Sequence, residues 1–156
     1  MEYFRREMVR ENMSHPARSV APEMTLRDLL RLLCTEHSGA FPVVRDEKLI
    51  GMVSKADSIK PFAIEAWTSA YDFDAIMGTT VEEIMSAPAA TIEVDATLEQ
   101  AAQLMSTLDF ASLPVVDREN RLEGIVDRDD VIRALARCTR RMSLPLDLQP
   151  MGYAIA

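Results

Sequence analysis

The stretch Ile84-Met85-Ser86-Ala87-Pro88 opens a pattern that the chain already contains once, from Asn12-Met13-Ser14-His15-Pro16 onward, at an offset of 72 (85 − 13 = 72). Further matched segments follow in the same order: Thr25-Leu26 with Thr97-Leu98, Pro42-Val43-Val44 with Pro114-Val115-Val116, and Gly51 with Gly124. An internal repeat constrains the architecture more strongly than any local pattern does. Two copies are too few for a solenoid, so we predict two like units that close on each other around a pseudo-twofold axis.

Each copy is predicted to run helix, strand, strand, helix, which makes the fold class α/β. Helical spacing is clearest in Leu26, Leu29, Leu30 and Leu33. Two short apolar runs in each copy, separated by polar residues, indicate a hairpin. We expect a further strand before each first helix, at Ser19-Val20 and at 91–94. Pro61 should break the last helix of the first copy.

These patterns divide the chain into a first repeat (9–59), an aromatic-rich linker (60–80), a second repeat (81–138) and an apolar C-terminal tail (139–156). The two repeats should form one compact module, because 156 residues suffice for a shared core. The linker holds the only tryptophan, Trp67, and we expect it to pack against the repeats. The tail carries few charges after Arg141, and we expect it to cover an interface or a cleft.

The net charge of −8 argues against nucleic acid as a partner, because binding phosphates requires a basic face. No apolar run reaches the ~20 residues of a membrane span, and the N-terminus lacks the apolar region of a secretory signal. Cys34 and Cys138 do not have the spacing of a metal site. We therefore expect two reduced thiols in a cytoplasmic protein without a metal and without a membrane partner.

In this order and at this spacing, the motifs resemble a tandem pair of cystathionine-β-synthase-type (CBS) domains, also called a Bateman module. In the second repeat the resemblance rests on Ile84 to Pro88, Asp95 to Leu98, Ser112 to Asp117 and Leu122 to Val126. In the first repeat it rests on Asn12 to Pro16, Ala40 to Val44 and Leu49 to Asp57. The resemblance covers roughly two thirds of the chain and implies a non-enzymatic regulatory module.

The resemblance also implies that adenosine-containing ligands bind in clefts between the repeats. In that family a Gly-x-x-Ser/Thr-x-x-Asp segment holds ribose and phosphate, and the segment around the Pro-Val strand holds adenine. The matching positions of the first cleft are Ser19, Ala40, Phe41, Pro42, Val43, Ser54, Lys55 and Asp57. Those of the second, weaker cleft are Thr91, Ser112, Leu113, Pro114, Val115, Asp127 and Asp130.

The residue types suit this chemistry. Asp57 is a carboxylate that accepts hydrogen bonds from neighbouring hydroxyls, and Ser54 lies where a helix N-terminus attracts anions. The same pair is also expected to form a capping box, and the two roles are compatible. In the second repeat Asp127 replaces Ser54 and should repel a phosphate. There the alternatives are a neutral nucleoside, S-adenosylmethionine, a metal-bridged nucleotide or no ligand.

We therefore expect a homodimer that has no obligatory cofactor, senses an adenine nucleotide or S-adenosylmethionine, and signals to an effector protein that the sequence does not identify. Three alternatives stay open at this point. The chain could be an interaction scaffold with empty clefts, or a regulator linked to DNA or RNA, which its acidic charge disfavours. It could also be a metal-dependent hydrolase that uses Asp127, Asp129 and Asp130.

Overall fold

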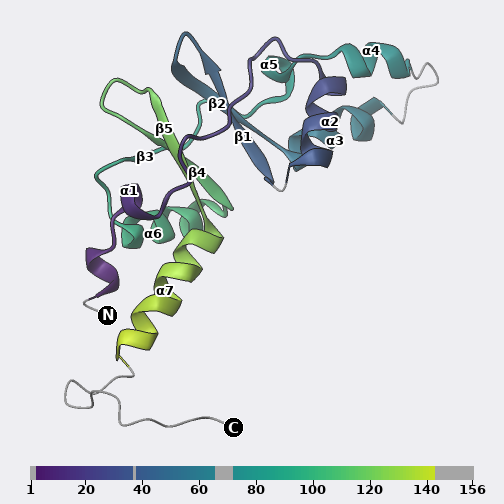
Figure 1. Cartoon of the computed structure of the whole chain (residues 1–156). Helices are drawn as coiled ribbons and strands as arrows, with labels where there is room; N and C mark the ends of the chain where they lie inside the picture. Colours follow the sequence, from purple (N-terminus) through teal and green to yellow (C-terminus); the bar gives the residue numbers. More distant parts are fainter. Residues whose placement is uncertain (1–2, 37, 66–71, 143–156) are drawn as a thin grey trace, which may run out of the picture.

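A computed structural model describes residues 3–36, 38–65 and 72–142 of the chain. It confirms the mixed α/β class and the order helix, strand, strand, helix in both repeats (Figure 1). The first repeat contains α2 (Leu26–Thr35), β1 (Ala40–Arg45), β2 (Lys48–Ser54) and α3 (Lys55–Glu65). The second contains β3 (Ile92–Glu93), α6 (Leu98–Leu108), β4 (Ser112–Val116), β5 (Leu122–Asp127) and α7 (Arg128–Met142). Short helices precede each repeat: η1 (Phe4–Arg6) and α1 (Val9–Asn12), then α4 (Phe73–Gly78) and α5 (Val81–Ile84).

The strands form two small sheets. β1 and β2 pair antiparallel, and in the second repeat β4 pairs antiparallel with β5 and parallel with β3. The strand expected at Ser19-Val20 is reduced to one parallel bridge between Val20 and Val43. The equivalent segment of the second repeat forms β3, which confirms the prediction there.

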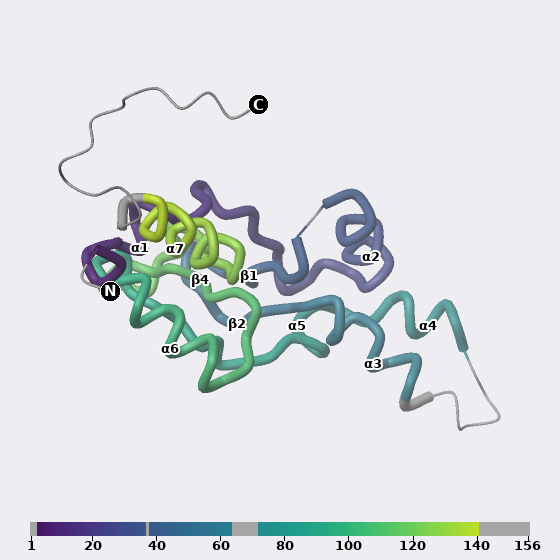
Figure 2. The backbone as a smooth tube through the Cα atoms, turned by 90° about the horizontal axis from the view of Figure 1, so that it is seen from below, coloured from purple at the N-terminus to yellow at the C-terminus, as the bar shows by residue number. Residues whose placement is uncertain are grey.

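The short helices that precede one repeat along the chain pack against the other repeat. Figures 1 and 2 both place α1 beside α7, and α1 and η1 contact the second repeat. Val9 of α1 is fully buried in the core of the second repeat, together with Leu98, Leu113 and Val126. Val81 of α5 is fully buried in the core of the first repeat. Each repeat therefore completes its core with a helix that precedes the other repeat along the chain.

The segments that follow α1 and α5 cross the hairpin of the other repeat, and equivalent backbone bridges hold them there. Ser86 pairs with Met52, and Ser14 pairs with Ile125. Ile125 is equivalent to Met52, because one residue inserted in the second copy makes the offset 73 from Gly51 onward (124 − 51 = 73). At Gly51 a Cβ atom would lie 2.7 Å from Sδ of Met85 and 2.9 Å from the carbonyl oxygen of Ser86. At Gly124 the corresponding distances to Met13 and Ser14 are 2.6 and 2.8 Å. The repeated glycines therefore leave room for the crossing segments.

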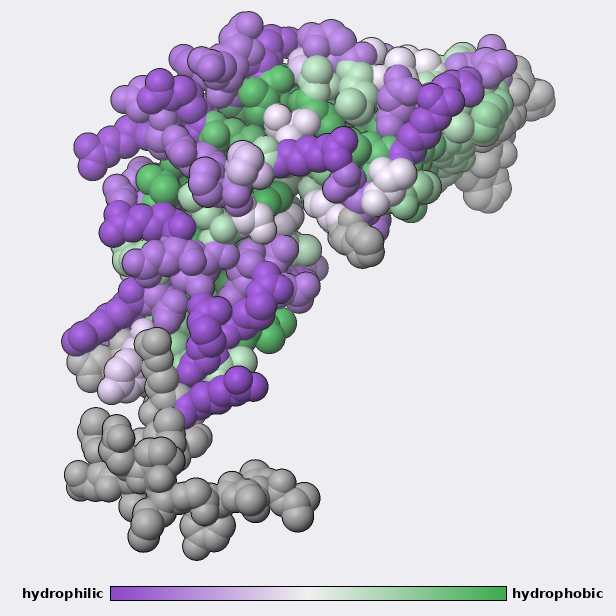
Figure 3. All heavy atoms as spheres, viewed as in Figure 1, coloured by the Kyte–Doolittle hydropathy of each residue, from purple (hydrophilic) through white to green (hydrophobic). Residues whose placement is uncertain are grey.

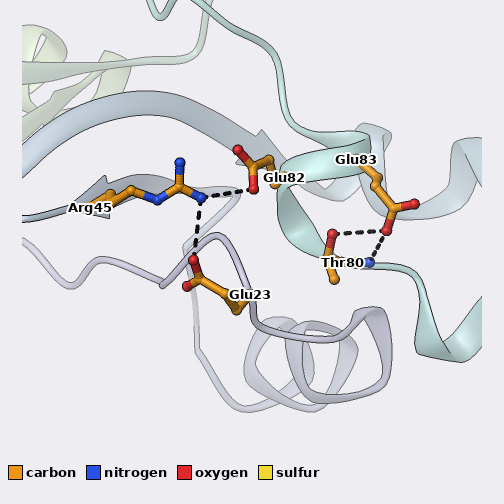
Figure 4. Close-up of polar contacts among 5 residues, drawn as sticks. All are labelled: Glu23, Arg45, Thr80, Glu82 and Glu83. Atoms are coloured by element: carbon orange, nitrogen blue, oxygen red, sulfur yellow. Dashed lines mark hydrogen bonds and ion pairs between the residues drawn. The ribbon is translucent and has the colours of Figure 1, made fainter.

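Polar contacts fasten the crossing helix α5 to the first repeat (Figure 4). At the end of β1, Arg45 donates to Glu82 of α5 at 2.8 Å and to Glu23 at 3.3 Å, and these carboxylates raise the pKa of its guanidinium. Thr80 donates to Glu83 at 2.8 Å through both its N–H and its hydroxyl, which caps the start of α5. These hydrogen bonds lower the pKa of the Glu83 carboxyl.

Two helices differ from their expected ends. The break at Pro61 is wrong, because α3 continues through it to Glu65. A proline inside a helix loses one hydrogen bond, and the packing of Phe62 against the first core offsets that loss. α7 extends to Met142, four residues beyond the expected end of the second repeat at 138.

The expected division into repeats, linker and tail stays a prediction. Two linker residues contact each other, Phe62 and Phe73, whose ring centroids are 6.1 Å apart. Trp67 and the tail beyond Met142 lie outside the described residues. On the face shown in Figure 3, hydrophobic side chains gather over the half built from the first repeat, whereas polar side chains dominate the other half.

We expect Gly51→Ala to lower the free energy of unfolding by about 1–3 kcal/mol, because the added methyl group overpacks the crossing of Met85 and Ser86. Urea unfolding measures this change. Gly39→Ala is the matched control, since a Cβ at Gly39 meets nothing within 4 Å. Equal unfolding midpoints for the two variants would show that the crossing tolerates a side chain.

Candidate functional site

The candidate residues of the first repeat meet where the hairpin enters α3. Ala40 pairs with Ser54 at the end of the hairpin, and the N–H of Lys55 donates to the carbonyl of Gly39 at 3.0 Å. Ser19 comes directly before Val20, whose N–H donates to the carbonyl of Pro42 at 2.9 Å. The structure thus brings residues 19, 40–43 and 54–57 together around this end of the hairpin.

The strand residues contribute unequally to any ligand contact. Phe41 and Val43 are buried in the first core, and side chains alternate between the two faces of a strand. Ala40 and Pro42 therefore point to the opposite face from Phe41 and Val43. In the second repeat Leu113 and Val115 are buried in their core in the same way. At these four core positions only the backbone remains for a ligand.

Ser54 and Asp57 form a closed capping box at the start of α3. Oδ2 of Asp57 accepts from the N–H of Ser54 at 2.8 Å and from its hydroxyl at 2.6 Å, and the N–H of Asp57 donates to Oγ of Ser54 at 3.2 Å. Oδ1 of Asp57 accepts from Nζ of Lys60. Asp57 is only 5% exposed, so the capping carboxylate is buried.

These contacts lower the pKa of the Asp57 carboxyl from its ordinary value. Burial acts to raise this pKa, but hydrogen bonds from Lys60 and from the hydroxyl and N–H of Ser54 outweigh it. The carboxylate is therefore ionised at neutral pH, and in that form it only accepts hydrogen bonds.

The second repeat has the same backbone arrangement at this point but different side chains. Ser112 pairs with Asp127, as Ala40 pairs with Ser54, and the N–H of Arg128 donates to the carbonyl of Ala111 at 3.0 Å. Asp127 and Asp130 cap each other through backbone N–H groups, both at 2.9 Å. Arg133 donates to Oδ1 of Asp130. Thr91 directly precedes β3, which pairs with β4 at Val115.

The carboxyl of Asp130 shifts in the opposite direction from that of Asp57. Burial raises the pKa of Asp130, the negative charge of Asp127 adds to this effect, and the Asp127 N–H and Arg133 only partly offset it. A hydroxyl at position 54 donates a hydrogen bond, whereas the carboxylate at position 127 contributes a like charge. The starts of α3 and α7 therefore differ electrostatically at equivalent positions.

The sequence reasoning missed the contact that covers each buried carboxylate. Neither Lys60 nor Arg133 was assigned to these carboxylates, yet each binds the acid three residues earlier. The available signal was the spacing of three, which places an acid and a base on one helix face. Ser58, which donates to the carbonyl of Lys55 at 2.7 Å, is a further buried polar residue near the site.

Two open pockets in the described part of the chain lie in the second repeat. One, of about 580 Å³, runs between β3 and α6, and Thr91 is the only candidate residue among its lining. The other, of about 350 Å³, lies between α6 and α7 and is lined by Met105, Val131 and Ile132 among others.

Within residues 3–36, 38–65 and 72–142, no three His, Cys, Asp or Glu side chains are grouped to hold a metal ion. No helix among the described residues is long and apolar enough to cross a membrane.

Comparison with known protein families matches the model of the CBS domain to residues 6–57 and 81–137. The chain belongs to the CBS domain family. This confirms the tandem pair that the repeated motifs indicated. The CBS match begins before Val9, in the segment that packs against the second repeat.

Relatives of this CBS pair include one protein sequence and two solved structures. The uncharacterized protein MJ0188 of Methanocaldococcus jannaschii is 32% identical over 126 residues, covering 81% of this chain and 43% of that protein. The chain spans about half the length of the curated relatives that it matches first. CBSX2 of Arabidopsis thaliana, solved in complex with AMP, is 28% identical with a TM-score of 0.73, covering 86% of this chain and 99% of that chain. The CBS domain pair of protein MJ0100, solved with 5-methylthioadenosine and S-adenosyl-L-methionine, is 25% identical with a TM-score of 0.70, covering 82% and 98%.

The opposite pKa shifts predict opposite pH dependences for two conservative variants. Ionised Asp57 favours the folded state above the ordinary carboxyl pKa, and this contribution is lost as the pH falls through its lowered folded-state pKa. Asp57→Asn should therefore lower the melting temperature more near pH 7 than near about pH 3.

Asp130 favours folding while protonated and loses that contribution as the pH rises through its raised folded-state pKa. Relative to the wild type, the melting temperature of Asp130→Asn should therefore be higher near pH 7 than near about pH 3. Scanning calorimetry across this range measures both variants. Parallel curves for the two variants would contradict the electrostatic difference between the two helix starts.

Proposed function

We propose that this CBS pair is a regulatory module that senses an adenosine-containing ligand, performs no catalysis itself and signals through an effector protein or through its oligomeric state. The observation that carries the proposal is Asp57, a buried carboxylate held ionised at the end of the hairpin. Its capping partner Ser54 pairs with Ala40 at the start of β1, and the adenine of the ligand is proposed to bind along residues 40–43 of that strand. CBS pairs that bind AMP or adenosyl compounds share this fold with the chain.

The first cleft is proposed to prefer a phosphorylated ligand. Residues 45–60 carry four basic and three acidic side chains, 4 − 3 = +1, whereas residues 117–133 carry four basic and six acidic ones, 4 − 6 = −2. Lys55 is exposed at the first position of α3, where the helix dipole also favours an anion. AMP, ADP and ATP are therefore the first ligands to test, and S-adenosylmethionine suits the second cleft better.

Isothermal titration calorimetry with AMP tests this assignment. We expect Asp57→Ala to weaken binding by about 1.5–3 kcal/mol, or roughly ten- to a hundredfold, because the ligand hydroxyls lose a charged acceptor. Asp130→Ala is the matched control, since it removes the equivalent carboxylate from the other cleft. Unchanged AMP affinity in a folded Asp57→Ala variant would remove Asp57 from the site.

Asp127 is proposed to keep phosphates out of the second cleft. It lies at the helix start where Ser54 lies in the first repeat, and its carboxylate repels an incoming anion. Asp127→Ser should therefore add or strengthen a site for adenine nucleotides there, seen in calorimetry as higher stoichiometry. If stoichiometry and affinity stay those of the wild type, the charge at position 127 does not control this cleft.

An interaction scaffold with empty clefts is the alternative function. It predicts no heat and no shift of the melting temperature with adenine nucleotides or S-adenosylmethionine at millimolar concentration. Mass spectrometry of small molecules released from the purified protein gives an independent answer. The proposal includes no nucleic acid among the partners, and it keeps the cytoplasm as the compartment because Cys34 and Cys138 are both free.

A homodimer is proposed because equivalent apolar side chains remain exposed on both repeats. Ile59 on α3 is 63% exposed and Ile132 on α7, its equivalent (59 + 73 = 132), is 60% exposed. Leu135 is also exposed on α7, and Ile132 borders the apolar pocket between α6 and α7. Covering such surface stabilises an association by about 25 cal/mol per Å² of apolar area.

Light scattering should therefore give twice the chain mass of 17.5 kDa at micromolar concentration. Ile132→Asp should dissociate the dimer, because burying its charge at the interface is unfavourable, and should leave the circular dichroism spectrum unchanged. Glu99→Ala, a change at an exposed residue on α6, is the control. A monomeric wild-type protein would contradict this proposal.

A further inference from the structure

Each repeat covers its buried carboxylate with a basic side chain from the next helical turn. Lys60 on α3 contacts Oδ1 of Asp57, and Arg133 on α7 contacts Oδ1 of Asp130. The side chain of Asp57 is 7% exposed and that of Lys60 is 58% exposed. The acid is therefore fixed in the protein, whereas the base reaches it from solvent.

The two oxygens of Asp57 have different partners. Oδ2 accepts both donors of Ser54 and belongs to the cap that starts α3. Oδ1 accepts only from Lys60 among the hydrogen bonds recorded for the described residues. A ligand hydroxyl that binds at Oδ1 leaves the cap intact but meets the ammonium group of Lys60 first.

We propose that Lys60 competes with ligand hydroxyls for Oδ1 of Asp57, and that a bound nucleotide releases its ammonium group from the carboxylate to the phosphate. This inference rests on the proposed function, in which Asp57 accepts the hydroxyls of a ribose. The exchange makes Lys60 a specificity-determining residue rather than a fixed part of the cap.

The exchange discriminates between ligands by their charge. A nucleoside that displaces Lys60 leaves the ammonium group with water as its new partner, so the lost ion pair opposes binding. A nucleotide supplies a phosphate, which replaces the carboxylate as an anionic partner. Lys60 therefore weakens the binding of adenosine and strengthens the binding of AMP at the same site.

The second repeat shows why the exchange belongs to the first cleft. Arg133 is attracted by Asp130 and also by Asp127 and Asp129, and these three carboxylates raise the pKa of its guanidinium. A released Arg133 stays among acids, and a phosphate there meets Asp127. The first repeat has a serine and an alanine, Ser54 and Ala56, at the positions of Asp127 and Asp129. Lys60 is therefore free of that additional attraction.

Calorimetric titration of wild type and Lys60→Met with adenosine and with AMP tests the inference. Methionine keeps an unbranched side chain of similar length and removes the charge. We expect adenosine to bind roughly two- to fivefold more tightly to the variant, the range that an exposed ion pair contributes. AMP should bind several-fold more weakly, so that the preference for AMP over adenosine falls by about tenfold.

Arg133→Met is the matched control, and it should leave both first-cleft affinities unchanged. Melting temperatures confirm that each variant is folded. Equal weakening of adenosine and AMP in Lys60→Met would mean that Lys60 only supports the carboxylate, and unchanged affinities would mean that it plays no part; either result overturns the exchange. A wild-type protein that binds neither compound would overturn the proposed function itself, and the exchange with it.

Discussion

The structure depends on one close approach, made twice. The backbone at Met85 and Ser86 crosses β2 at Gly51, and the backbone at Met13 and Ser14 crosses β5 at Gly124. A side chain at either glycine would overlap the crossing segment. Because the crossing carries α5 into the first core and α1 into the second, neither repeat completes its hydrophobic core alone. The stable unit is therefore the pair of repeats. Any cleft between the repeats depends on α1 packing in the second core and α5 in the first.

The same symmetry allows the two sites to diverge without a change of fold. A helix start can be capped by Ser54 or by Asp127, because either side chain accepts from a backbone N–H. The cap is thus conserved in geometry but not in charge. The hydroxyl of Ser54 helps to keep Asp57 ionised, whereas Asp127 helps to raise the pKa of Asp130. A different side chain at the capping position thus contributes to opposite pKa shifts at two equivalent carboxyls.

Part of the site could be recognised before the structure, and part could not. The Ser54–Asp57 capping box follows from spacing along one helix and was predicted correctly. The direction of the pKa shift at Asp130 could not be predicted, because it depends on how deeply the fold buries the carboxyl. The helix break predicted at Pro61 was wrong, because the packing of α3 against the first core outweighs the local effect of the proline.

The repeat, the α/β order of elements and the family could all be predicted from the sequence, because they depend on patterns that are local and occur twice. The structure was needed to show that Val9 packs in the second core and Val81 in the first. It also decided that Lys60 and Arg133 cover the buried carboxylates. The physical reason is that periodicity reports which face of an element is apolar, but not which of two nearly identical partners will bury that face.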